Sequence, residues 1–321
     1  MKTRTAEESK QLYQGVFVAA PTPMRADYSL DLARFRTCLD YLVEAGMVTG
    51  QGVYVVLGAG GEHMHLSTDE RKAVAEAAVE AAAGRLPVFV GVSHNATHLA
   101  VELARHAERI GADGLQLEPP YYFGGTPDDT FEYFQAVSDA VSLGTTAYNT
   151  PWTSGFDMDR AFIGRLAGLA NIIGLKWYSA NQREYAHVVR ECHTRFSILS
   201  NFYGGLNASA FLLGARGYVS QAANFAPRNS LKILSALRSG EYRQATDLYL
   251  QVDGAYYDDL GKLFAEGYAG EGNFIKACMP LVGIDCGPAR RPHRTPPAWF
   301  ADHMRQVLAA AGEQVAIARE V

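Results

Sequence analysis

Short apolar runs alternate with longer amphipathic stretches over the first two thirds of the chain. Most of the short runs are apolar at every position rather than at every second one. Strands that are buried on both faces have this pattern, and parallel sheets are the usual reason. The pattern predicts eight strands, at residues 15–20, 52–57, 87–92, 114–118, 145–149, 172–177, 197–201 and 217–221.

The stretches between these strands carry helix signals. Leucine and phenylalanine recur at helical spacing over residues 32–42, and Gly46 stands where a helix C-terminal glycine is expected. Ser67 and Glu70 have the spacing of a capping box. Eight strand-then-helix units in a row predict an α/β fold, a closed (β/α)8 TIM barrel. A doubly wound open sheet is the alternative, but no Gly-rich dinucleotide turn follows the first strand.

The pattern changes after residue 226, because helical periodicity continues without intervening strands. We expect residues 1–226 to form the barrel that carries the active site. Residues 227–321 should form a C-terminal α-helical extension packed on the barrel. Its helices are predicted at residues 231–237, 242–264, 274–281 and 299–310.

Composition excludes several classes of protein. The 321 residues carry a net charge of -5 and no basic stripe, which argues against a nucleic-acid partner. The basic run at 290–294 is short, and we interpret it as a solvated loop. No segment has the ~18 apolar residues of a membrane span, and residues 1–14 lack the apolar core of a signal peptide. Four widely spaced cysteines indicate reduced thiols, so we expect a soluble, cytoplasmic protein.

Candidate chemistry is sought at the C-terminal ends of the strands, where barrels of this type place their active sites. Lys176 lies in an otherwise apolar sixth strand. Burial should lower the pKa of its amine and make it a nucleophile, although a lysine that reaches solvent or pairs with a carboxylate is equally compatible with the strand alone. Tyr148 ends the fifth strand and could move protons, and Tyr121 and Tyr122 follow the fourth. Each tyrosine taken alone is more often structural.

The loop Gly58-Ala59-Gly60-Gly61-Glu62 follows the second strand. Small residues in a row leave backbone N–H groups exposed, which suits a carboxylate or a phosphate. The loop is neither a Walker loop nor a dinucleotide fingerprint. We interpret Glu62 as a structural acceptor rather than a catalytic base.

Together these elements resemble the family of dihydrodipicolinate synthase and N-acetylneuraminate lyase, the class I aldolases. The resemblance covers nearly the whole chain, starting from the first strand and its Pro21-Thr22-Pro23. Four ordered motifs carry it: Gly58-Ala59-Gly60-Gly61-Glu62, Pro120-Tyr121-Tyr122, Tyr148-Asn149-Thr150-Pro151 and Gly174-Leu175-Lys176.

The resemblance implies roles for these residues. Lys176 would form an imine with the keto carbon of a small 2-oxo acid. Tyr148 would relay protons to and from the carbinolamine and the leaving or attacking oxygen. Tyr122 would reach into the site of a neighbouring subunit, which implies a homo-oligomer, a dimer or a tetramer. The protonated imine acts as the electron sink, so no metal or organic cofactor is needed. The expected substrate contacts are Ala59, Gly60, His63, Trp152, Thr153 and Val219.

This chain departs from the family pattern at two places. Ala59 and Gly60 replace the hydroxyl pair that holds the substrate carboxylate. Each lost hydrogen-bond donor lowers the binding free energy by about 0.5–1.5 kcal/mol. Trp152 and Thr153 stand where the synthase branch has an arginine, which disfavours a role in lysine biosynthesis. We therefore expect a substrate with an apolar or aromatic portion, because the mouth is predicted to be aromatic at Phe123, Trp152, Trp177 and Tyr178.

Two other classes of function stay open. His63, His65, His94 and His98 follow the second and third strands and could serve a metal-dependent hydrolase, although they are more often surface, capping or substrate-contact residues. His63 is the best candidate to replace a lost hydroxyl contact. A non-catalytic homologue that binds a 2-oxo acid without turnover is the third reading. Within the lyase reading, dehydration, aldol cleavage, condensation and decarboxylation all share one imine or enamine.

Overall fold

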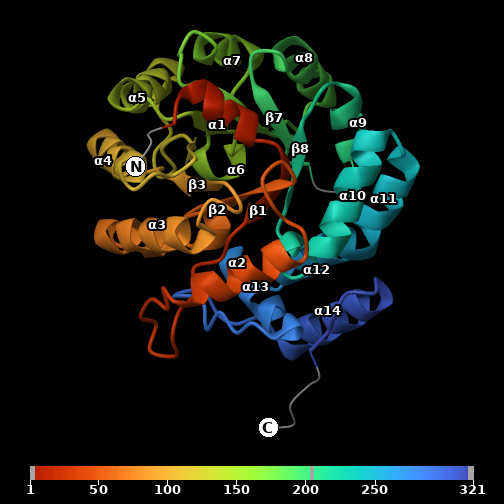
Figure 1. Cartoon of the computed structure of the whole chain (residues 1–321). Helices are drawn as coiled ribbons and strands as arrows, with labels where there is room; N and C mark the ends of the chain where they lie inside the picture. The colour runs from red at the N-terminus through yellow and green to blue at the C-terminus, as the bar shows by residue number, and fades with distance from the viewer. Residues whose placement is uncertain (1–3, 203–205, 317–321) are drawn as a thin grey trace.

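The computed structural model describes residues 4–202 and 206–316. Its eight parallel strands pair in sequence order and close on themselves, β8 beside β1, so the barrel is confirmed and the open sheet is wrong (Figure 1). Each strand lies within a predicted run and differs from it by no more than one residue at either end. The strands are β1 Gly15–Ala19, β2 Gly52–Val56, β3 Val88–Gly91, β4 Gly114–Leu117, β5 Thr145–Tyr148, β6 Ile172–Trp177, β7 Ser197–Ser200 and β8 Gly217–Ser220.

The strands are apolar throughout because each one packs on two sides. Phe17, Leu199 and Val219 belong to a cluster that fills the inside of the barrel. Neighbouring strand positions belong to a larger cluster between the strands and the surrounding helices. Trp177 is in this outer cluster and only 1% exposed. The expectation that Trp177 lines the mouth is therefore wrong, since side chains alternate along a strand and Trp177 points to the opposite face from Lys176.

Helices surround the strands, as Figure 1 shows. The capping box predicted at Ser67 and Glu70 is confirmed. Gly46, which follows α2 (Arg34–Glu44), has a φ of +98°, as expected of a helix C-terminal glycine. A short helix at the N-terminus, α1, was not expected from its polar sequence. The helices of this part are α1 Ala6–Leu12, α2 Arg34–Glu44, α3 Thr68–Ala82, α4 Thr97–Arg109, α5 Pro127–Ala140, α6 Pro151–Ser154, α7 Arg160–Leu166, α8 Gln182–Cys192 and α9 Asn207–Leu212, with short 3-10 turns η1 Ala59–Gly61, η2 His63–His65 and η3 Ala222–Asn224.

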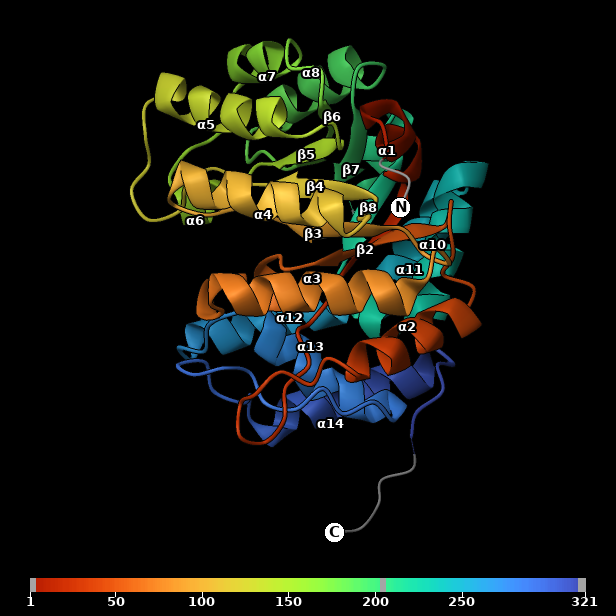
Figure 2. The ribbon, with the colours of Figure 1, turned by 60° about the vertical axis from the view of Figure 1, so that its left-hand side comes forward.

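The chain after residue 226 is helical, and residues 227–316 contain no strand. In both views the C-terminal helices α12, α13 and α14 lie together on one side of the barrel, near α2 (Figures 1 and 2). Their apolar side chains form a second cluster, to which α2 contributes Cys38. The division at residue 226 stays a prediction. The elements are α10 Pro227–Ser239, α11 Tyr242–Tyr249, the π-helical turn η4 Leu250–Gly254, α12 Ala255–Ala265, α13 Gly272–Cys278, the turn η5 Met279–Val282 and α14 Ala298–Ala310.

The C-terminal helices also contact the loop that follows β2. A Cβ on Gly272, the first residue of α13, would come within 2.7 Å of the Gly60 carbonyl oxygen. This close approach brings the start of α13 to the end of the barrel where the strands finish. Within the described part of the chain, no helix combines the length and the apolar character needed to cross a membrane.

Candidate active site

Lys176 is the fifth of the six residues of β6 and is 7% exposed. Its amine nitrogen lies 3.8 Å from the centre of the Tyr148 ring and 4.4 Å from the centre of the Phe17 ring. Within residues 4–202 and 206–316, no carboxylate oxygen lies within 4.0 Å of that nitrogen. The amine is thus held against aromatic faces and is not part of a contact ion pair.

Burial makes the neutral form of Lys176 more accessible than it is in an exposed lysine. Burial lowers the pKa of the amine to about 8, and the charges of Glu271 and Glu118 oppose this shift. At pH 7 a pKa of about 8 leaves about a tenth of the amine unprotonated, far more than for an exposed lysine. Burial also raises the pKa of Glu118 to about 7, while the charge of Lys176 pulls it down. The lysine is therefore suited to attack a carbonyl carbon.

A pocket of about 310 Å³ opens at this end of the barrel, and we call it the mouth pocket. It brings together four of the predicted site residues: Ala59, Tyr148, Trp152 and Thr153. The Lys176 amine lies against the Tyr148 ring that forms part of its wall. The lining residues are Ala59, Met64, His65, Glu118, Tyr148, Thr150, Trp152, Thr153, Phe264, Gly270, Glu271 and His293.

A second pocket of about 310 Å³, the side pocket, adjoins the first. The two share Trp152, Phe264 and Glu271 as common walls. Trp152 packs edge-on against Tyr178, with ring centres 5.3 Å apart. The shared walls extend the mouth pocket into a mainly apolar space, which is lined by Trp152, Gln221, Tyr257, Leu260, Gly261, Phe264 and Glu271.

The loop after β5 is held by Asn149. Its amide nitrogen donates to the Asp157 carboxylate at 2.7 Å and to the Tyr178 carbonyl at 2.8 Å. Its amide oxygen accepts from the backbone N–H of Met158 at 3.0 Å. This buried side chain fixes the turn that begins α6 and thereby the place of Trp152.

The other predicted site residues, Lys176 included, lie outside the mouth pocket lining. Gly60 is buried, and a Cβ there would come 3.0 Å from the Ile275 side chain. Val219 faces the barrel interior and is 7% exposed. Tyr122 is 76% exposed and packs edge-on against Phe123, itself 80% exposed. The roles expected of Gly60, Val219 and Tyr122 stay predictions.

His63 is buried beside the pocket wall. Its Nε2 lies 3.6 Å from a carboxylate oxygen of Glu118, and its ring meets the Tyr121 ring edge-on. Burial lowers the pKa of His63 to about 3, so the ring is neutral near pH 7 and the contact with Glu118 is not an ion pair. His63 touches the carboxylate of Glu118 rather than lining the pocket, and its role in substrate binding stays a prediction.

Glu62 has the structural role that was expected. One carboxylate oxygen accepts the backbone N–H of Arg290 at 2.7 Å, and the other forms a buried ion pair with Lys276. The residue itself has a left-handed backbone, with a φ of 57°. Glu62 thus joins the loop after β2 to the C-terminal segment and does not face the substrate space.

Seven lining residues of the mouth pocket were not assigned to the site from the sequence: Met64, Glu118, Thr150, Phe264, Gly270, Glu271 and His293. Glu118 and Thr150 could have been found, because Glu118 is the last residue of the predicted strand 114–118 and Thr150 lies within the motif Tyr148-Asn149-Thr150-Pro151. Phe264 and Glu271 belong to the C-terminal extension. No local signal distinguishes them from ordinary packing and surface residues of a helical segment.

The histidines after β2 and β3 do not converge. His65 packs edge-on against His293, and Nδ1 of His94 accepts the backbone N–H of Ala96. In the part of the chain that the structure describes, no three residues of the metal-ligating types are grouped to hold an ion. The metal-dependent reading therefore has no ligand set to support it here.

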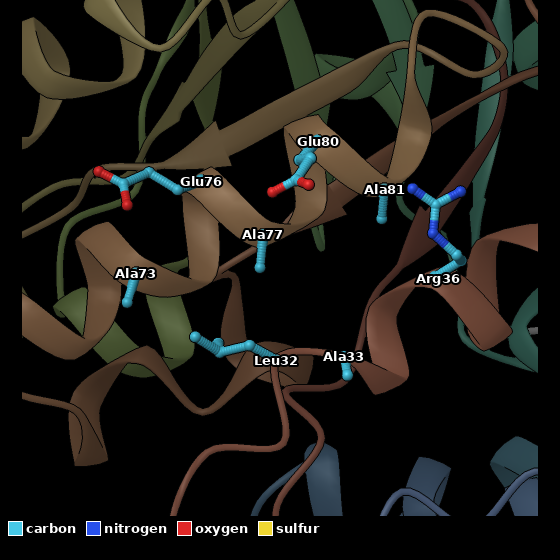
Figure 3. A pocket seen from close by; sticks show the side chains of 8 residues that line it. All are labelled: Leu32, Ala33, Arg36, Ala73, Glu76, Ala77, Glu80 and Ala81. Atoms are coloured by element: carbon cyan, nitrogen blue, oxygen red, sulfur yellow. The ribbon is translucent and has the colours of Figure 1, made fainter.

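A groove of about 390 Å³ lies between α2 and α3, on the outside of the barrel (Figure 3). Its walls are the Leu32 side chain and alanine methyl groups, with Glu76 and Glu80 on α3 and Arg36 on α2 (Figure 3). The groove contains none of the predicted site residues. We place the chemistry at the mouth pocket.

The closed parallel barrel and the buried Lys176 at its strand ends, which has no contact ion pair within the described residues, agree with the class of barrel lyases. Residues 12–311 match the dihydrodipicolinate synthetase family, and the chain belongs to that family. The resemblance inferred from the four motifs is thus confirmed. Members of the family are lyases of the class I aldolase type.

The curated relatives include a synthase and an aldolase. A 4-hydroxy-tetrahydrodipicolinate synthase of Acidiphilium cryptum (strain JF-5) is 38% identical over 73% of this chain and 78% of its own. YagE of Escherichia coli (strain K12), provisionally named a 2-dehydro-3-deoxy-D-gluconate aldolase, is 32% identical over 92% of this chain and 94% of its own.

Solved structures agree in fold. The crystal structure of YagE in complex with pyruvate has a TM-score of 0.82 and 27% identity, covering 94% of this chain and 99% of YagE. The N-acetylneuraminate lyase of Proteus mirabilis has a TM-score of 0.80 and 25% identity, covering 94% and 99%.

Proposed function

We propose that this protein is a Schiff-base lyase, an aldolase or dehydratase, that acts on a small 2-oxo acid through Lys176. The observation that carries the proposal is the amine of Lys176, buried against the Tyr148 ring without a contact ion pair in the described structure. A lysine in such surroundings is a nucleophile at neutral pH. The YagE structure, which holds pyruvate, supports a 2-oxo acid as the ligand class.

The proposed reaction begins when the Lys176 nitrogen attacks the keto carbon. Tyr148 moves protons to and from the carbinolamine oxygen, which leaves as water. The protonated imine then accepts the electron pair released when a bond at the neighbouring carbon breaks. Backbone N–H groups at Ala59 and Gly60 would hold the substrate carboxylate, since these positions carry no hydroxyl.

The proposal includes a substrate with an apolar or aromatic portion beyond the reacting carbons. Trp152 and Phe264 line both pockets and are 48% and 52% exposed, so their rings are open to a ligand. Turnover of aryl-bearing 2-oxo acids should be compared with turnover of sugar-derived ones. A clear preference for the sugar acids would refute this part.

The assembly and the location are further parts of the proposal. A homo-oligomer, a dimer or a tetramer, would give the exposed Tyr122 and Phe123 a partner surface. We place the protein in the cytoplasm, in keeping with its four free cysteines. Sedimentation of wild type and Tyr122→Ser would test the oligomer, with a shift to smaller species expected.

Borohydride trapping tests the central claim. Pyruvate and borohydride should give a stable adduct on the peptide that contains Lys176, detected by intact mass and peptide mapping. Lys176→Met should abolish the adduct, and Lys72→Met, a surface lysine of α3, should keep it. Tyr148→Phe should keep the adduct and lower turnover by roughly 10²–10⁴-fold. No adduct, or an adduct on another lysine, would overturn the proposal.

A further inference from the structure

Two cysteines that are far apart in the sequence meet where the barrel and the C-terminal helices join. Cys38 lies on α2, and Cys286 lies on the segment between η5 and α14. Their sulfur atoms are 3.7 Å apart, so either thiol can donate a hydrogen bond to the other. The two positions are separated by 248 residues of the chain. Neither thiol takes part in the lysine chemistry proposed above.

Both thiols are buried in the apolar cluster that joins α2 to the C-terminal helices. Cys38 is 3% exposed and Cys286 is 0% exposed. Figures 1 and 2 show α2 on the same side of the barrel as α13 and α14. A buried cysteine commonly serves as a small apolar residue. Two thiols in contact between distant segments can also react with each other, which ordinary apolar side chains cannot do.

The backbone around the two sulfur atoms differs on the two sides of the contact. Cys38 lies in the middle of the helix α2. Cys286 belongs to residues 284–297, which contain neither helix nor strand. Its carbonyl oxygen accepts the backbone N–H of Met24 at 2.9 Å, so the segment is held against the barrel. A disulfide requires the sulfurs to approach to about 2.0 Å, and we expect the irregular segment to make that shift.

The segment that carries Cys286 continues to the mouth pocket. The backbone N–H of Arg290 donates to the Glu62 carboxylate at 2.7 Å, and its guanidinium donates to Glu70 at 2.7 Å. His293, which follows closely, lines the mouth pocket. A covalent bond at Cys286 would therefore tie the start of a pocket-forming segment to α2.

The resting state of this thiol pair is reduced. The contact with Cys286 and burial both raise the pKa of the Cys38 thiol. Because the thiolate is the form that reacts with oxidants, the pair should resist weak oxidants at neutral pH. This agrees with the cytoplasmic location proposed above, where thiols are kept reduced. A small uncharged peroxide is the class of oxidant that suits a buried sulfur.

We propose that Cys38 and Cys286 are a redox-sensitive pair, which a peroxide oxidises reversibly to a disulfide that joins α2 to the C-terminal segment. The inference does not depend on the proposed Schiff-base function. A bond between positions so far apart in the chain restricts the unfolded state, so the oxidised protein should be more stable than the reduced one.

The oxidation takes place in two steps that balance with hydrogen peroxide. In the first step one sulfur attacks a peroxide oxygen, the O–O bond breaks, and a sulfenic acid and one water form. In the second step the other sulfur attacks the sulfenic sulfur, the S–O bond breaks, and the disulfide and a second water form. The two thiols together lose two electrons and two protons, and the peroxide takes up both. A dithiol reductant reverses the reaction.

Peptide mapping of the full chain tests the bond. The native protein is treated with hydrogen peroxide, its remaining thiols are blocked with iodoacetamide, and it is digested without reductant. A protease that cleaves before aspartate releases Cys38 in residues 31–39 and Cys286 in residues 285–301, away from Cys278. These two peptides should appear joined, lighter by two hydrogens than their sum, and dithiothreitol should separate them.

Variants then assign the sulfurs. Cys38→Ala and Cys286→Ala should each abolish the joined peptide. Cys278→Ala, buried in the same cluster, and Cys192→Ala, partly buried on α8, are the matched controls and should keep it. The urea midpoint of oxidised wild type should exceed that of the reduced protein by roughly 1 M. Peroxide should give no such rise in Cys38→Ala.

The proposal fails if the joined peptide does not form in the native protein. It also fails if the peptide forms only when peroxide is added in urea, because the folded contact would then not bring the sulfurs together. A urea midpoint of the oxidised protein equal to or below that of the reduced one would show that the bond does not stabilise the fold. If an alanine variant fails to fold, the map of wild type decides, since it identifies both cysteines directly.

Discussion

Lys176 and Lys276 are both almost completely buried, at 7% and 4% exposure, yet their amines have different neighbours. The Lys276 amine forms a buried ion pair with Glu62 and donates to the carbonyl oxygen of Pro288 at 3.0 Å. The Lys176 amine faces the rings of Tyr148 and Phe17. Lys276 joins two segments, and Lys176 contacts the Tyr148 ring that lines the mouth pocket.

Burial lowers the pKa of both amines, so burial alone does not distinguish them. Glu62 opposes the shift at Lys276 through direct contact, whereas Glu271 and Glu118 oppose it at Lys176 only through their charges. An amine in a contact ion pair cannot attack a carbonyl without leaving its partner. The comparison teaches that two features distinguish a lysine suited to act as a nucleophile. It has no carboxylate within hydrogen-bond distance, and it lies next to a pocket wall.

The largest expected effect separates the two lysines by activity. Lys176→Met should lower kcat by on the order of 10⁴-fold or more, because the covalent step is lost. Its stability should equal or exceed that of wild type, since a desolvated amine is removed. Steady-state assays and urea unfolding measure the two quantities. A variant that loses stability but keeps activity would show that Lys176 is structural.

The second largest expected effect separates Lys176 and Lys276 by their contributions to stability. Lys276→Met should lower the free energy of unfolding by about 3–5 kcal/mol, because the buried Glu62 carboxylate is left without its cation. The double variant Glu62→Gln/Lys276→Met is the control, and it should recover most of the loss. Urea unfolding at fixed protein concentration measures both. A cost below about 1 kcal/mol for Lys276→Met would show that the ion pair does not hold the segments together.

The smallest effect concerns the pH dependence of Lys176. The free amine reacts, so the trapping rate with pyruvate should rise with pH through the pKa of about 8. A carboxylate nearby favours the ammonium, so Glu271→Gln should lower this pKa and move the rise to lower pH. A shift of half a unit to one unit raises the rate below the pKa by roughly three- to tenfold.

Glu118→Gln is the matched comparison for this pH shift. Glu271 has the larger influence on Lys176, so the shift should be smaller for Glu118→Gln. A shift to higher pH in either variant would contradict the charge arrangement described above.

The sequence predicted the barrel and its lysine because both have local signals. Residues 172–177 read as a strand that is buried on both faces, and Lys176 is the one ionised side chain in it. The predicted helix over 242–264 is interrupted by the π-helical turn η4, where the buried Asp253 accepts from the Ser220 hydroxyl at 2.6 Å. That contact joins residues 33 positions apart and has no local pattern.

Only part of the candidate site could be predicted from the sequence, because some of its residues have local signals and others are placed by long-range contacts. Tyr148 and Trp152 stand next to strand ends and were found. Glu271 reaches the pocket because α13 packs on the loop after β2, a contact that no periodicity reports. Trp177 was placed at the mouth wrongly: side chains alternate along a strand, so Trp177 points away from the face that carries its neighbour Lys176.

The fit between Gly60 and Ile275 limits how this active site can be altered. A Cβ at position 60 would come 3.0 Å from the Ile275 side chain, so a serine or threonine there requires the end of that side chain to move. A chimera that joins this barrel to the tail of a relative would bring together surfaces shaped for different loops. Reshaping the substrate specificity of this protein by exchange of parts therefore has to treat these two distant segments as a single unit.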